Sequence, residues 1–313
     1  MNRLRRIAYT ALALVAVLLL TGLYRFLDSR GIFNRSREAV PATCRLQAET
    51  GAVADIASDG KTAYIAAGKG LFLYAGEGLK KLAGTPKTSR IAALSLGRGA
   101  AFLRAVLIEG DGHFAVSLFR LKPEGVEELG RISTDMLASP TAIAAPDGER
   151  FYIVNHSESR TGLGRWLDDV LLLPRAHLLW FDGMKFVAVA EHLNSPSGLA
   201  LSADGSHLYI AQDFPRTVVG TARSDFTGAI DNPSALSLPA GPQKLSLAPD
   251  GSLIVAARPA PGSGAVYRLR LENGAPQSAE ALFATGRAEV RAAAELPGKL
   301  LVGTDKALVV CEP

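Results

Sequence analysis

The residues with the most chemistry to offer in this chain are five histidines and two cysteines, and they form no ready-made catalytic motif. His113, His177, His192 and His207 show no metal-ligand spacing, and surface or turn positions are expected for them. The chain contains neither a Gly-x-Ser-x-Gly nucleophile elbow nor a glycine-rich phosphate loop, so serine-hydrolase and nucleotide chemistry have no support. Any site must therefore be assembled by the fold from distant residues.

A repeated phrase shows which elements would do this. In Ser195–Gln212, SPSGLALSADGSHLYIAQ, two short apolar runs flank an Asp-Gly turn, which predicts a β-hairpin. Further copies lie at Ser139–His156 and Gly241–Arg258, a shorter one starts at Ala54, and fainter ones without Asp-Gly start at Ser89 and Ala288. Six copies at intervals of roughly 35 to 55 residues predict an all-β fold, a six-bladed β-propeller.

Length and composition agree with one large domain. The 313 residues are 48% hydrophobic, and the predicted propeller, residues 42–313, accounts for nearly all of them. The formal net charge is only +4. Outside Arg3, Arg5 and Arg6, no basic cluster is interleaved with aromatic residues, so nucleic acid is not an expected partner.

The N-terminal segment predicts the compartment. Ile7–Tyr24 is an uncharged, mostly apolar run preceded by three arginines, which favours a transmembrane signal anchor over residues 1–28 and a linker over 29–41. A cleaved signal peptide is the alternative, but no small-x-small cleavage site follows the run. We expect a single-pass protein attached to the cytoplasmic membrane through residues 7–24, with its propeller facing the periplasm or the exterior.

The two cysteines stand at the two ends of the predicted propeller. Cys44 precedes the first repeat and Cys311 is third from the C-terminus. In a closed ring the first and last strands share a blade, and an oxidising compartment would let a disulfide between them persist. Two buried free thiols remain the alternative.

The ends of the chain also carry a resemblance. Cys44-Arg45-Leu46 with Glu49-Thr50-Gly51, and Gly298–Thr304 with Ala307–Glu312, are similar to the opening and ending of the paraoxonase and arylesterase family. This family of calcium-dependent six-bladed propellers is related to strictosidine synthases and gluconolactonases. The resemblance covers nearly the whole chain, and it implies a disulfide between the two cysteines and an uncleaved hydrophobic N-terminus.

The family's calcium ligands, however, do not carry over. Its Glu, Asp and Asn ligands sit where the inner strand of each blade begins, and the corresponding residues here are Ala54-Asp55, Thr141-Ala142, Ser197 and Gln243-Lys244. The two family histidines fall at Ser89 or Arg90 and near Glu109. Calcium takes six to eight oxygen ligands, several of them charged. We therefore expect no metal and no other cofactor.

Lys244 is the most informative of these positions, because an ammonium would repel a divalent cation nearby. The second position in the other blades is assigned to Asp55, Arg90, Ala142, Gly198 and Glu289. Acids and bases that face one another around the axis would satisfy each other. The predicted tunnel-lining set is Asp55, Arg90, Thr141, Ser197, Gln243, Lys244 and Glu289; ordinary solvent-exposed loop charges are the alternative.

Two further features bear on function. His156 ends the strand Tyr152–Asn155 and is the weak candidate for a displaced catalytic histidine, although a polar strand end is commoner. Ser157–Pro174 departs from the repeat, and its apolar residues have helical spacing. The simplest expectation is a helix that packs on the propeller. A lid or membrane contact, the role the resemblance implies at this place, is the alternative.

Two functions therefore stay open. The missing ligands favour a non-catalytic propeller that binds a small molecule or a protein partner at its tunnel mouth. The resemblance favours an ester or lactone hydrolase with an altered or metal-independent site. The fold alone does not decide between them.

Overall fold

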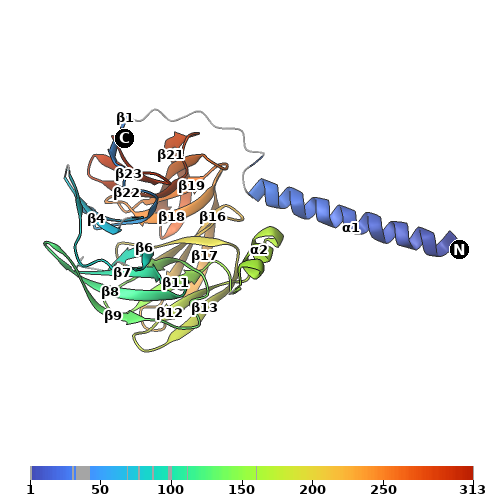
Figure 1. Ribbon diagram of the computed structural model, residues 1–313, viewed down its shortest axis with the longest axis horizontal. Helices are drawn as coiled ribbons and strands as arrows, with labels where there is room; N and C mark the ends of the chain where they lie inside the picture. Colours follow the sequence, from blue (N-terminus) through green and yellow to red (C-terminus); the bar gives the residue numbers. More distant parts are fainter. Residues whose placement is uncertain are drawn as a thin grey trace.

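The described chain consists of an N-terminal helix and a ring of β-sheets, as the computed structural model in Figure 1 shows. The structure describes residues 2–29, 32, 43–68, 70–76, 78–86, 88–97, 101–110, 112–159 and 161–312. The predicted linker, 29–41, lies outside the described residues apart from Ser29 and Ile32.

Within these residues, six four-stranded antiparallel sheets form the six blades. Blade 1 has β2 (Val53–Ser58), β3 (Thr62–Ala67), β4 (Gly70–Ala75) and β5 (Gly78–Lys81). Blade 2 has β6 (Arg90–Leu96), β7 (Phe102–Ile108), β8 (Phe114–Lys122) and β9 (Gly125–Ile132). Blade 3 has β10 (Pro140–Ala144), β11 (Phe151–Asn155), β12 (Ala176–Phe181) and β13 (Phe186–Leu193).

Blade 4 has β14 (Pro196–Leu201), β15 (His207–Gln212), β16 (Thr217–Arg223) and β17 (Ile230–Ser237). Blade 5 has β18 (Gly241–Leu247), β19 (Leu253–Arg258), β20 (Gly264–Glu272) and β21 (Ala275–Thr285). Blade 6 has β22 (Val290–Leu296), β23 (Lys299–Thr304), β24 (Leu308–Glu312) and β1 (Thr43–Ala48). The first two strands of each blade coincide with one copy of the sequence repeat, so the six-bladed prediction is confirmed.

The Asp-Gly turns of the repeat have a local cause. Gly205 and Gly251 have φ angles of 69° and 84°, in the left-handed region that glycine enters without a steric penalty. The preceding aspartates accept main-chain N–H bonds from within the turn; Asp204, for example, accepts from Ser206 at 3.1 Å. Hydrogen bonds from the Ser202 and Ser206 side chains and from this N–H hold the pKa of Asp204 well below its ordinary value. The turn therefore forms from its own residues and fixes the hairpin register.

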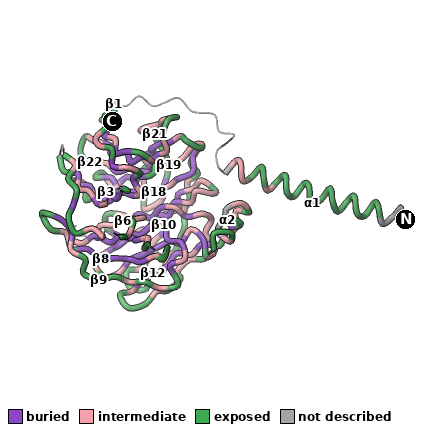
Figure 2. Tube along the Cα trace, in the orientation of Figure 1, coloured by how far each residue is buried: buried purple, intermediate pink, exposed green. Residues whose placement is uncertain are grey.

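The core is divided among the interfaces between blades. Six clusters of buried apolar side chains occur in the described residues, and each combines residues of two neighbouring blades. One of them joins Val53 and Ile65 of blade 1 to Leu301 and Val310 of blade 6, which closes the ring. Figure 2 shows this burial concentrated in the strands of the propeller, whereas the N-terminal helix is largely exposed.

The two ends of the propeller meet in blade 6. β1 pairs with β24 in antiparallel register, and Cys44 lies opposite Cys311. Their sulfur atoms are bonded, which confirms the predicted disulfide over free thiols. The bond joins positions that are 267 residues apart in sequence, so it ties the first strand of the ring to the last.

The N-terminal helix, α1 (Asn2–Ser29), extends away from the propeller (Figure 1). Its segment Arg5–Asp28 has a mean hydropathy of 2.1 and is long and apolar enough to be a membrane anchor or a signal sequence. Near the end of α1, the Asp28 carbonyl accepts a hydrogen bond from Arg216 in the loop between β15 and β16.

The second helix, α2 (Gly162–Leu171), confirms the predicted helical segment between β11 and β12. Thr161 caps its first turn by accepting from Gly164 N at 3.0 Å. Asp168 is buried, and its carboxylate accepts from the hydroxyls of Ser157 (2.6 Å) and Ser159 (2.7 Å).

Four apolar side chains of α2 lie on its outer surface, whereas Val170 is half-buried. Leu163, Trp166, Leu167 and Leu171 are all exposed. The helix therefore contacts the propeller through Asp168 and the half-buried Val170, while these four apolar side chains face outward. A lid or membrane contact remains a prediction.

Candidate functional site at the tunnel mouth

The inner strands of all six blades contain a β-bulge near their first residues. Each pairs with its neighbour in a register that skips one residue, and the skipped residues are Ala54, Ala92, Thr141, Ser197, Gln243 and Arg291. Such a bulge leaves the extra residue out of the ladder and redirects its side chain. All six line a cavity at this end of the central tunnel, which we call the entry mouth.

The entry mouth has a volume of about 390 Å³, within the range of small-molecule sites. Besides the six bulge residues it is lined by Pro140, His156, Asp213, Lys244, Arg258, Glu289 and Val290. Asp213 and His156 directly follow the second strands of blades 4 and 3, and Arg258 ends that of blade 5. The residues that start the inner strands and those that end the second strands therefore line the same cavity.

A buried ion pair crosses the axis of the ring beneath this hollow. The Lys244 Nζ of blade 5 lies 3.5 Å from the Asp55 Oδ2 of blade 1, and both side chains are nearly buried. Lys244 also donates a hydrogen bond to the Thr141 carbonyl of blade 3. Asp55 accepts from the main-chain N–H groups of Leu94 and Ile56, each at 2.9 Å. The pair therefore links blades 1, 2, 3 and 5.

Burial raises the pKa of Asp55, while the Lys244 charge and the two main-chain donors oppose the rise. A carboxylate buried in this way is costly unless a cation and hydrogen-bond donors accompany it. Lys244 supplies the cation. Its removal would leave Asp55 as an uncompensated charge in the middle of the ring.

Two more ion pairs line the walls of the entry mouth. Arg258 Nη2 lies 2.8 Å from Asp213 Oδ2, which joins the blade 5 wall to the loop after β15. Arg291 Nη2 lies 3.7 Å from Glu289 Oε2, and both of these side chains are partly exposed. The first pair is hydrogen-bonded, whereas the second is longer than a hydrogen bond.

The hydroxyl groups of the entry mouth connect adjacent blades. Thr141 Oγ1 donates to the Pro196 carbonyl at 3.0 Å, and Ser197 Oγ donates to the Pro242 carbonyl at 2.6 Å. These bonds satisfy carbonyl groups on the free edges of inner strands. Each hydroxyl has then used its proton and faces the mouth as an acceptor.

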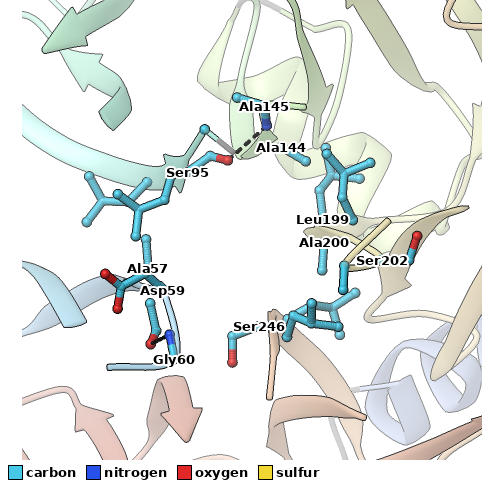
Figure 3. Close-up of a pocket in the computed structure, with 18 of the residues that line it drawn as sticks. Ala57, Asp59, Gly60, Ser95, Ala144, Ala145, Leu199, Ala200, Ser202 and Ser246 are labelled. Carbon is cyan, nitrogen blue, oxygen red and sulfur yellow. Dashed lines mark hydrogen bonds between the residues drawn. The ribbon is translucent and has the colours of Figure 1, made fainter. Parts of the chain in front are cut away.

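A second cavity of about 590 Å³ lies at the other end of the tunnel, where the inner strands of blades 1 to 5 end; we call it the exit mouth (Figure 3). Alanine, leucine and serine make up most of its lining, with Ala57, Ala144, Leu199 and Ala200 among the labelled residues, and Asp59 and Lys61 are its charged residues. Its serines bond to neighbouring blades. Ser95 Oγ accepts from Ala145 N at 2.8 Å, shown dashed in Figure 3, and Ser246 Oγ donates to the Ala293 carbonyl at 2.8 Å.

The donor set at the tunnel centre does not suit calcium. Calcium requires six to eight oxygens, yet the ammonium of Lys244 lies against the Asp55 carboxylate and takes the Thr141 carbonyl. Across the part of the chain that the structure describes, no three His, Cys, Asp or Glu residues gather in a group able to hold a metal.

Of the seven predicted tunnel-lining residues, the structure contradicts one, Arg90. Five of the residues, Thr141, Ser197, Gln243, Lys244 and Glu289, line the entry mouth, and Asp55 lies buried beneath it. Arg90 is exposed and does not line the mouth. The second positions of blades 2 and 6 are Ala93 and Ala292 rather than Arg90 and Glu289, because the bulges fall at Ala92 and Arg291. Glu289 reaches the mouth from the loop before β22 instead.

The positions assigned to the two family histidines also lie away from the mouth lining. Ser89 Oγ donates to Glu109 at 3.3 Å, and Glu109 pairs with Arg131 at 2.6 Å. His156, the weak candidate, does line the entry mouth. The interpretation of tunnel charges as ordinary loop charges is contradicted for Lys244 and Asp55, which are nearly buried.

Three charged residues of the entry mouth, Asp213, Arg258 and Arg291, were not predicted from the sequence. Asp213 and Arg258 lie at the ends of the second strands of the clearest repeats, so a comparison of that position between repeats would have found them. Arg291 lies in a faint copy without the Asp-Gly turn, and only the observed register identifies it as the bulge residue.

The fold and the site define the class of protein: a closed six-bladed propeller with charged and polar residues around one mouth of its central tunnel. The family model for arylesterases matches residues 101–282, more than half of the chain, and the chain belongs to this family. No curated protein sequence matches it.

Solved structures agree on the fold. A gluconolactonase from Xanthomonas campestris is 17% identical with a TM-score of 0.59, covering 90% of this chain and 99% of its own. A soluble aldose sugar dehydrogenase from Escherichia coli is 13% identical with a TM-score of 0.57, covering 87% of this chain and 100% of its own. At these identities the similarity concerns the fold alone.

Proposed function

We propose that this protein is a ligand-binding member of the arylesterase family, anchored in the membrane, in which the Lys244 ammonium takes the place of a central calcium. One observation carries the proposal, namely the Lys244–Asp55 ion pair, 3.5 Å long, at the centre of the ring. It joins inner strands of blades that are not neighbours, which is the mechanical role expected of a central metal. The residues that would polarise a substrate through a metal are absent from the equivalent positions.

The test combines stability with activity. The full chain is purified in detergent micelles, and its melting temperature is measured in millimolar calcium and, separately, in excess chelator. Hydrolysis of aryl esters and lactones is assayed under both conditions. We expect the same melting temperature in both and no hydrolysis above the background rate. A melting temperature that rises with calcium would contradict the replacement of the metal by Lys244.

A metal-independent hydrolase is the second candidate, and the position of His156 in the entry mouth favours it. A histidine there could take a proton from water as a general base. Arg258 or Lys244 could then stabilise an oxyanion. Hydrolysis that is unaffected by chelator and abolished by His156→Gln would support this candidate against a purely binding role.

The anchoring proposal is supported by α1 and by the arginines at its start. The apolar segment follows arginines, and such a basic flank stays in the cytoplasm, so the propeller would face the periplasm or the exterior. The Arg216–Asp28 contact brings the end of α1 to the loop that also carries Asp213 of the entry mouth. The exposed apolar face of α2 would then contact the membrane beside it.

Fractionation of cells tests the anchor. We expect the full-length chain, with its N-terminal residues intact, in the membrane fraction, and its propeller accessible to protease from outside the cytoplasm. A soluble mature form that starts after residue 24 would contradict the anchor and support a cleaved signal sequence.

A further inference from the structure

The six bulge residues of the entry mouth are sorted by chemistry around the ring. Blades 1 and 2 contribute Ala54 and Ala92, blades 3 and 4 contribute Thr141 and Ser197, and blades 5 and 6 contribute Gln243 and Arg291. The mouth therefore has an apolar sector, a hydroxyl sector and a sector of N–H donors. The donor sector also contains Lys244 and Arg258 of blade 5.

Two donors of this sector, Arg291 and Gln243, make only long contacts within the described chain. Arg291 is about half exposed, and its single ion pair in the described chain, with Glu289, is 3.7 Å long. A guanidinium has five N–H donors in a planar fork that matches a carboxylate. Gln243 Nε2 makes only long contacts, of 3.4 Å, with the Gly241 and Pro242 carbonyls.

The other two cations are more firmly paired. Arg258 bonds Asp213 at 2.8 Å, and Lys244 bonds Asp55 and the Thr141 carbonyl. Counting the buried pair, the mouth has three basic and three acidic residues, so its formal net charge is zero. Binding of a charged ligand therefore depends on which charged group is loosely paired. That group is the Arg291 guanidinium.

We propose that the entry mouth binds a small monocarboxylate, with its charged group between Arg291 and Gln243 and its apolar body against Ala54 and Ala92. This inference rests on the proposed function and names the ligand class for the same site. The volume of about 390 Å³ accommodates a ring-sized molecule. Glu289 competes with the ligand for Arg291, so its charge weakens binding.

The test uses the full chain in lipid nanodiscs at low salt, with benzoate as the probe and benzamide as its neutral match. Saturation-transfer NMR titrations, with empty nanodiscs as the blank, give the two dissociation constants. We expect benzoate to bind at least about 10-fold more tightly than benzamide, because a charge-assisted bidentate contact is lost in the amide. Added salt should weaken benzoate binding and leave benzamide unchanged.

Three variants assign the effect to residues. Arg291→Gln should weaken benzoate binding about 10-fold, and Glu289→Gln should strengthen it severalfold. Arg270→Gln is the matched control, since Arg270 is an exposed arginine of β20 that lines neither mouth, and it should leave binding unchanged. The opposite signs expected at positions 291 and 289 separate recognition from a general loss of structure.

The inference fails if benzamide binds as tightly as benzoate, if neither binds, or if Arg270→Gln weakens binding as much as Arg291→Gln. Its failure is distinct from that of the proposed function. If calcium and chelator leave the melting temperature unchanged while benzoate does not bind, the ligand class is wrong and Lys244 still replaces the metal. If calcium raises the melting temperature, the proposed function fails whatever benzoate does.

Discussion

The two mouths of the tunnel are built from the same inner strands, yet they differ in chemistry. The entry mouth collects Lys244, Arg258, Arg291, Asp213 and Glu289. The exit mouth is lined mainly by alanine, leucine and serine, with Asp59 and Lys61 as its charged residues. The difference arises at the bulges, which occur near the start of each inner strand and redirect one side chain per blade. No register shift is seen near the ends of these strands. The bulges thus give the entry mouth one redirected side chain from each blade, which the exit mouth lacks.

The largest expected effect comes from the central ion pair. Lys244→Met keeps most of the stem volume but leaves the Asp55 carboxylate buried without a cation, so the free energy of unfolding should fall by about 3 to 5 kcal/mol. Lys61→Met, at an exposed lysine of the exit mouth, should change it by less than about 0.5 kcal/mol. Urea unfolding of the two variants in micelles measures both values. Equal losses would remove the distinction between the mouths.

A steric test of the entry mouth follows from Gly198 in β14. A Cβ there would lie 3.0 Å from both the Lys244 Cα and the Leu245 N of the next blade, so blades 4 and 5 would have to separate slightly. Gly198→Ala should cost about 1 to 3 kcal/mol and lower the melting temperature. Gly130→Ala in β9 is the control, because a Cβ there meets nothing within 4 Å. A Gly198→Ala variant as stable as Gly130→Ala would mean that the inner strands are not closely packed here.

The sequence predicted the propeller well because its signal is repeated. Alternating apolar runs around Asp-Gly turns occur in several copies, so the faint copies at Ser89 and Ala288 could be placed from the others. Lys244 and Asp55 could be placed at the tunnel for the same reason, since both lie in copies that keep the Asp-Gly turn. In the faint copies no Asp-Gly turn marks the hairpin, so the position of the bulge could not be counted from it. The second position of the inner strand was therefore assigned to Arg90 and Glu289, three residues before its observed place at Ala93 and Ala292.

Other parts of the site could not be predicted from local pattern. Whether Asp213 meets Arg258 depends on the packing of blade 4 against blade 5, which no single repeat encodes. The outward apolar face of α2 was also unpredictable, because helical spacing gives an apolar face without saying what that face contacts. Asp168 decides the orientation by bonding two serines of the loop before the helix.

Two serines, Ser246 at the exit mouth and Ser197 at the entry mouth, each donate a hydrogen bond to a carbonyl of the next blade. Ser246→Ala removes the partner of the Ala293 carbonyl in a buried setting, which should cost about 1 to 3 kcal/mol. Ser197→Ala removes the partner of the Pro242 carbonyl at the entry mouth, where water can replace the hydroxyl, and should cost about 1 kcal/mol or less. Thermal unfolding of both variants measures the order. The reverse order would indicate that the entry-mouth hydroxyls are the structural ones.

The smallest expected effect is a pH dependence of the Lys244→Met defect. Burial raises the pKa of Asp55, and the variant also lacks the Lys244 charge that lowers it. A carboxyl with a raised folded-state pKa binds its proton at a higher pH in the folded state than in the unfolded state. The free energy of unfolding of the variant therefore increases as the pH falls through that pKa. The melting-temperature gap between Lys244→Met and the wild type should therefore narrow from pH 8 to pH 5. A gap that widens over this range would contradict the assignment to Asp55.

The most direct measurement is a double-mutant cycle of Lys244→Met and Asp55→Asn, with free energies of unfolding for the wild type, both single variants and the double variant. If the ammonium and the carboxylate stabilise the ring through each other, the double variant loses clearly less than the sum of the single losses. We predict a coupling energy of about 2 kcal/mol or more, at the upper end for residues in contact. Additive losses, with a coupling energy near zero, would contradict the claim that this ion pair holds the inner strands of the ring together.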